Sequence, residues 1–137
     1  MIKHLLISSA LLSCLWVVLA SAKQPLEDSE LTLLMRSMAD EMKKVKSVVL
    51  TDKFYDKWEV DYKHMLVATP STEAKKGPKF NDFAKAFLTQ LSRTQENKDV
   101  SQIRPQFNLL VNSCIHCHES FCPGPLSMLK KLRVPEL

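Results

Sequence analysis

The chain has 137 residues, and its 19 basic and 15 acidic side chains give a formal net charge of +4 at pH 7. No basic stripe is interleaved with aromatic residues, so the sequence offers no case for nucleic-acid binding. No nucleophile, base and orienting group can be assembled from it, which argues against a hydrolytic or group-transfer enzyme. Glycine occurs only twice and β-branched alternation is nowhere sustained, so the pattern predicts an all-α protein.

The first 22 residues predict a cleaved secretory signal peptide. Lys3 supplies a short basic region, an apolar run covers residues 5–20, and Ala20-Ser21-Ala22 offers small side chains for cleavage. The alternatives are a membrane anchor, for which the run is short, and a lipoprotein processed at Cys14. Cleavage after Ala22 leaves residues 23–137 without a membrane span and predicts a periplasmic location.

Apolar residues that alternate in steps of four and three predict the first helix, over residues 28–50. Its inward positions are Leu31, Met35, Met38, Met42, Val45 and Val49. A second helix is expected over residues 52–68, because Thr69-Pro70 disfavours helical geometry beyond that point. Its inward positions are Phe54, Trp58, Tyr62 and Met65.

A polar connection over residues 70–79 precedes the third predicted helix, residues 80–96, which buries Phe83, Phe87 and Leu91. The fourth predicted helix covers residues 99–121, and Pro123-Gly124-Pro125 ends it. Its inward positions are Ile103, Phe107, Leu110, Cys114, Cys117 and Phe121. Helices joined by such short connections predict an up-down-up-down four-helix bundle.

The mature chain is therefore divided into a helical domain, residues 23–121, and a C-terminal extension, residues 122–137. Apolar residues of the extension alternate with Lys130, Lys131 and Arg133. We expect this short amphipathic piece to fold back over the core. Docking to an acidic partner or to a membrane surface is the alternative.

The last turns of the fourth predicted helix contain Cys114-Ile115-His116-Cys117-His118, the C-x-x-C-H pattern of covalent haem attachment. Thiols three positions apart share a helix face and can each add to a porphyrin vinyl group, and His118 would be the proximal iron ligand. One alternative is a thioredoxin-like dithiol, which would follow a strand. Another is half of a zinc site, but His64 and Cys122 lack the matching spacing. With export predicted, the motif indicates one covalent haem c with its iron.

The predicted bundle brings the start of the first helix and the end of the fourth to the same end of the molecule. At about 1.5 Å per residue, Met35 and His118 would each lie roughly 5–11 Å from that end. Met35 is therefore the predicted distal iron ligand and Met38 the second choice; the alternative is that both only fill the core. Arg36 could pair with a haem propionate, or simply remain solvated.

These features resemble the cytochrome c′ and cytochrome b562 superfamily. The likeness covers almost all of residues 23–121 and rests on Met35, Met38, Met42, Ala68-Thr69-Pro70, Phe80, Phe83 and the haem motif. It implies a small periplasmic four-helix haem protein. In one branch of that superfamily a Met and a His ligate the iron, and in the other the iron is five-coordinate and binds small gases.

We therefore expect an electron carrier, and not an enzyme, that exchanges electrons with protein redox partners. The alternative is a haem protein with an open distal site for nitric oxide or another small gas. Cys122, beyond the resemblance, is the odd thiol. It is either a partly buried bystander, a redox-sensitive thiol near the haem, or the source of an intermolecular disulfide in a homodimer.

Overall fold

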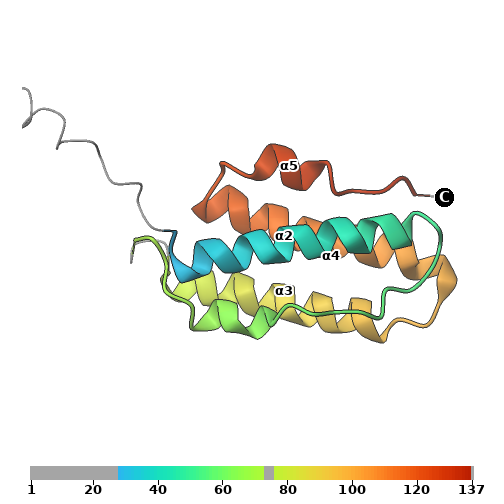
Figure 1. Cartoon of the computed structure of the whole chain (residues 1–137), viewed down its shortest axis with the longest axis horizontal. Coiled ribbons are helices and arrows are strands. Elements are labelled where there is room, and N and C mark those ends of the chain that lie inside the picture. The colour runs from blue at the N-terminus through green and yellow to red at the C-terminus, as the bar shows by residue number, and fades with distance from the viewer. Residues whose placement is uncertain (1–27, 73–75, 137) are drawn as a thin grey trace, which may run out of the picture.

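The computed structural model describes residues 28–72 and 76–136, and this part of the chain is helical and contains no strand (Figure 1). Its elements are α2 (Glu30–Val49), the 3-10 helix η1 (Tyr62–Leu66), α3 (Pro78–Glu96), the 3-10 helix η3 (Val100–Gln102), α4 (Ile103–Phe121) and α5 (Leu126–Lys130). The all-α prediction is confirmed for these residues. The predicted signal peptide, residues 1–22, lies outside them.

Helix α2 confirms the first predicted helix. The Ser29 hydroxyl caps it by accepting the N–H of Thr32 at 3.2 Å, which satisfies one of the free donors at a helix start. The face predicted by the four-three spacing is the buried one from Met38 onward, where Met42 and Val45 are 2% and 1% exposed. The sequence period therefore places this helix correctly against the core.

Helices α3 and α4 confirm the third and fourth predicted helices. Pro78 opens α3 and Pro105 lies in the first turn of α4, where a missing N–H costs no intrahelical bond. Phe107, Leu110 and Val111 of α4 have no exposed surface. Because α4 contacts α2, α3 and α5, it is the central element of the fold.

The chain reverses direction between its long elements, so that α2 and α3 run one way and α4 runs back (Figure 1). The start of α2, the start of α3 and the end of α4 consequently lie at the same end of the molecule. No helix in the described ranges is both long and apolar enough to cross a membrane.

The predicted second helix, over residues 52–68, is wrong. The segment turns at residues 50–52, where Asp52 has a positive φ of 55°, and then runs extended until the short η1. Its aspartates, aromatic residues and valine are weak helix formers. The steps of four between Phe54, Trp58 and Tyr62 resemble a helical period, but they occur here in a segment that is largely extended.

Glu41 of α2 supplies the physical reason. Its carboxylate is only 2% exposed and accepts the backbone N–H of Glu59 at 2.6 Å and of Val60 at 3.4 Å. The Tyr62 hydroxyl donates to the same carboxylate. Two backbone donors at the end of the segment are thus satisfied by a side chain of a neighbouring helix instead of by helical bonds. Burial and the Glu41 carboxylate raise the pKa of Tyr62, so it stays a hydrogen-bond donor.

The C-terminal extension folds back over the core, as expected. Leu129, Leu132 and Val134 are 4–5% exposed and pack on the central cluster. The Asn108 side chain donates to the Val134 carbonyl and accepts the Val134 N–H, both at 3.0 Å. The Lys46 ammonium donates to the carbonyl of Lys131 at 2.6 Å. The extension is therefore part of the folded unit.

We predict that Leu132→Ala lowers the free energy of unfolding by roughly 2–5 kcal/mol, because it leaves a cavity beneath the extension. The matched control is Leu109→Ala on α4, whose side chain is 49% exposed and whose replacement should change stability by about 0.5 kcal/mol or less. Urea unfolding followed by circular dichroism measures both. Equal, small effects would show that the extension does not contribute to the core.

Candidate functional site

A cavity of about 360 Å³ lies where α2 begins and α4 ends, and its volume falls within the range of roughly 300–1,000 Å³ typical of small-molecule pockets. Five parts of the chain form its walls: the start of α2, the loop after η1, the start of α3, the end of α4 and the extension. The lining residues are Ser29, Leu31, Thr32, Met35, Arg36, Ala39, Pro70, Ser71, Phe80, Cys117, His118, Phe121, Cys122, Pro125, Met128 and Leu129.

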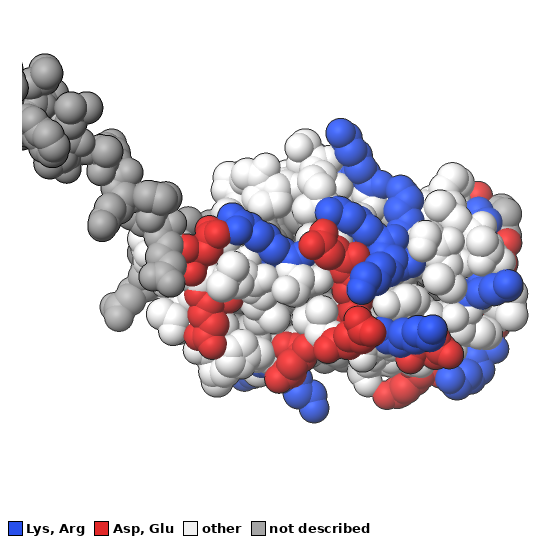
Figure 2. Space-filling model, in the orientation of Figure 1, with Lys and Arg blue, Asp and Glu red and all other residues white. Residues whose placement is uncertain are grey.

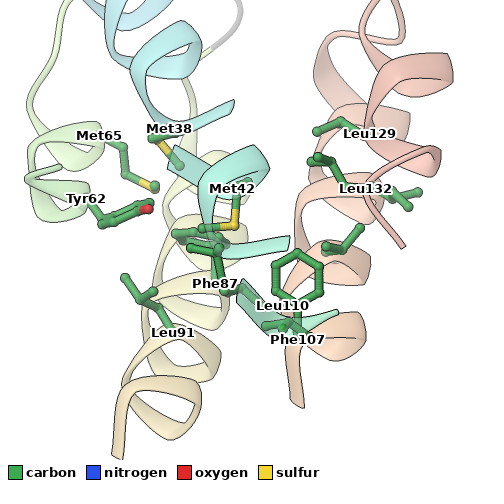
Figure 3. Packing of buried hydrophobic residues seen from close by; sticks show 14 of the residues in the cluster. Met38, Met42, Tyr62, Met65, Phe87, Leu91, Phe107, Leu110, Leu129 and Leu132 are labelled. Atoms are coloured by element: carbon green, nitrogen blue, oxygen red, sulfur yellow. The ribbon is translucent and has the colours of Figure 1, made fainter. Parts of the chain in front are cut away.

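The two methionines predicted as alternative ligands lie in different places. Met35 is half-buried and lines the cavity. Met38 is 7% exposed, belongs to the core and lies beside Met65 and Tyr62 (Figure 3). Three residues rotate an α-helix by roughly 300°, so side chains three apart point about 60° away from each other. That rotation separates a cavity-lining thioether from a core-filling one.

His118 lines the cavity from the last turn of α4, and one of its ring nitrogens is already engaged. Its Nδ1 lies 2.9 Å from the carbonyl oxygen of Cys122. A carbonyl only accepts, so Nδ1 carries the proton of the neutral ring and Nε2 keeps a free lone pair. Such a bond to a backbone carbonyl is the usual means of orienting an imidazole for metal binding through its other nitrogen.

The two motif cysteines differ in their surroundings. Cys117 lines the cavity, whereas Cys114 packs against the core and does not line it. Burial raises the pKa of the Cys114 thiol to about 12, and the neighbouring Cys117 adds to the rise. Burial alone raises the pKa of Cys117 to about 11. Both are therefore neutral thiols at physiological pH.

Aromatic contacts fix the end of α4 at the cavity. The ring of Phe121 packs edge-on against Phe80 at 5.9 Å and against Phe83 at 5.7 Å between centroids. The structure thus brings Met35, Cys117 and His118 to one cavity, at the end of the molecule where α2 begins and α4 ends. It leaves Met38 and Cys114 outside the lining.

The loop after η1 is tied to the start of α2 beside the cavity. Glu30 accepts the N–H of Thr69 at 2.8 Å and pairs with His64 Nε2 at 2.5 Å. The Thr69 N–H and then His64 lower the pKa of the Glu30 carboxyl. His64, one of the two residues considered for a zinc site, therefore pairs with Glu30 and is not among the residues that line the cavity. No group of three or more His, Cys, Asp and Glu side chains suited to a metal forms in residues 28–72 and 76–136.

Sequence reasoning expected the extension to fold back over the core near the haem end and gave Cys122 as a thiol near the haem, but it did not identify Pro125, Met128 and Leu129 as residues that line the cavity. Cys122, Pro125, Met128 and Leu129 all line it. The amphipathic pattern of the extension was the available signal for burial, but it carries no information on which surface the segment covers. Comparisons with protein-family models, with curated proteins and with solved structures found no match.

We predict that in protein made without haem Cys117 reacts with iodoacetamide faster than Cys114 at pH 8. Only the thiolate is nucleophilic, and a pKa of about 12 against about 11 leaves Cys114 roughly tenfold less ionised, besides its deeper burial. Peptide mapping after timed labelling gives both rates, and labelling in 8 M urea is the control, where the rates should converge. Faster labelling of Cys114 in the folded protein would contradict this geometry.

Proposed function

We propose that the chain is a periplasmic c-type cytochrome that carries one covalent haem and transfers electrons, with His118 and Met35 as iron ligands. The observation that carries the proposal is the cavity that Met35, Cys117 and His118 line together, with Nδ1 of His118 engaged and Nε2 free. Within this proposal the protein is related to the cytochrome c′ and cytochrome b562 type, and an irregular segment, residues 53–61, replaces most of the second helix of the predicted four-helix bundle.

The residues present fit iron porphyrin. A thioether and an imidazole with one free nitrogen are the donors that electron-transfer haem proteins use as axial ligands. Leu31, Phe80 and Phe121 supply apolar walls suited to a porphyrin face. Cys117 can form a thioether at the cavity wall. Cys114 lies one turn earlier and does not line the cavity. Peptide mapping therefore tests the thioether at Cys114 separately from the one at Cys117.

Bound iron porphyrin would supply a reversible one-electron ferric–ferrous couple. Residues of the chain hold the proposed ligand His118 and the end of α4 in place, so that their positions need not change between the ferric and ferrous states. The Cys122 carbonyl orients the His118 ring, and the aromatic cluster at Phe121 holds the end of α4 in place. A Met35 thioether bound to the iron would favour its reduced state, because a thioether is a soft neutral donor.

Protein redox partners are the proposed donor and acceptor, and a homodimer joined through Cys122 is the alternative to a monomer. Basic and acidic side chains are interspersed on the face formed by α2, α5 and the segment after α5, and the basic ones are prominent beyond α5 (Figure 2). Lys130, Lys131 and Arg133 are exposed, while Leu132 between them and Leu129 before them are buried. This face therefore combines a structural role with a modest positive charge for encounter with an acidic partner.

We predict that the secreted protein has the mass of residues 23–137 plus one haem, retained after denaturation because thioethers survive it. Intact mass spectrometry measures this, and peptide mapping shows whether Cys114 and Cys117 are both attached. Cys117→Ala should leave the haem attached only through Cys114, and Cys114→Ala should leave it attached only through Cys117. Ser113→Ala, between the α4 core and the motif, is the control that should keep full haem. A mass equal to the bare chain would overturn the proposal.

We predict that Met35→Ala removes the near-infrared sulfur-to-iron band of the ferric protein and allows carbon monoxide to bind the ferrous form. Met38→Ala, the matched control, should keep the band but lower the free energy of unfolding by roughly 2–5 kcal/mol, because Met38 is a core residue. Absorption spectra and urea unfolding distinguish the two. A high-spin wild type with a silent Met35→Ala would favour the gas-binding function instead.

A further inference from the structure

Among residues 28–72 and 76–136, Arg36 is the one permanently charged side chain that lines the cavity. It follows Met35 on α2, and its side chain is 62% exposed, which places the guanidinium at the solvent edge of the cavity. The remaining lining is apolar apart from hydroxyls, thiols and the His118 ring. A cation at the rim of such a cavity suits an occupant that is apolar through most of its body and anionic at one edge.

The guanidinium has capacity for such an anion. Its Nη1 and Nη2 donate to the two carboxylate oxygens of Asp28, the second at 3.0 Å. An arginine has five N–H donors, so this pair leaves three for another acceptor. Because Asp28 is itself 40% exposed, water screens the pair and an incoming carboxylate can compete with it. The planar fork of an arginine matches a carboxylate in two parallel bonds.

The polar groups of the cavity are also divided between walls. Ser29, Thr32 and Arg36 follow one another at helical spacing on α2, and the Ser29 and Thr32 hydroxyls are 2.9 Å apart. Cys117 and His118 lie on α4. A haem has the same division, since its vinyl groups lie at one edge and its two carboxylates at another. We propose, resting on the haem function above, that Arg36 binds a haem carboxylate and exchanges Asp28 for it. The α2 rim thereby receives the anionic edge while the vinyl edge meets α4.

The test compares holoprotein carrying Arg36→Gln, Arg36→Lys or Asp28→Asn with the control Arg93→Gln, an exposed arginine on α3 away from the cavity. Arg36→Gln should shift the carboxylate bending mode of the haem in the resonance Raman spectrum and lower the reduction potential, because a nearby positive charge favours the ferrous state. Arg36→Lys should keep part of the effect. Asp28→Asn should raise the reduction potential, because the Arg36 charge is then no longer neutralised by the Asp28 carboxylate. Arg93→Gln should change neither quantity.

Each outcome decides a different point. If the wild type has no haem by intact mass, the proposed function itself fails. If the variants carry haem but Arg36→Gln behaves like Arg93→Gln in both the vibrational mode and the potential, Arg36 does not bind the carboxylate. A change of potential with an unchanged mode would mean that Arg36 acts only through its charge, which also overturns direct binding. Should Arg36→Gln not accumulate, Asp28→Asn and Arg36→Lys decide, since both keep a cation at this position.

Discussion

The burial of α4 is the constraint on which the rest of the structure depends. Phe107, Leu110 and Val111 have no exposed surface, and α2, α3 and the C-terminal extension all pack on this helix. Burying side chains of this size contributes about 1.5–3 kcal/mol each, so the helix has little freedom to slide or rotate. Cys117 and His118 belong to the last turns of the same helix. The buried residues of α4 therefore also fix the positions of Cys117 and His118.

The hydrogen bond between His118 and the Cys122 carbonyl determines which nitrogen of the imidazole ring is available to bind a metal. It ends α4, begins the extension and assigns the imidazole proton to Nδ1 in one contact. The extension then returns along α4 and adds Met128 and Leu129 to the cavity wall. Residues of the C-terminal extension, which sequence reasoning expected to cover the core, thus also complete the candidate site. The consequence is that stability and the proposed iron ligation are coupled through the same few residues.

Sequence reasoning predicted α2, α3 and α4 because each has a sustained apolar period and a clear start or stop signal. It failed over residues 52–61, where the decisive contact comes from Glu41, a charged residue in the middle of another helix. A buried carboxylate that accepts backbone N–H groups from a distant segment leaves no local pattern. The apolar period also could not separate Met35 from Met38 as candidate ligands. Both belong to the same seam, and only the packing of Met38 with Met65 and Tyr62 separates them (Figure 3).

Iron-edge X-ray absorption of the purified holoprotein tests the central claim most directly, because it reports the atoms bound to the metal. The account predicts one iron per chain, bound by the four porphyrin nitrogens, one imidazole nitrogen and one sulfur. The sulfur should disappear in Met35→Ala and remain in Met38→Ala. Absence of iron, or an iron shell without sulfur in the wild type, would contradict the assignment of His118 and Met35 as a ligand pair.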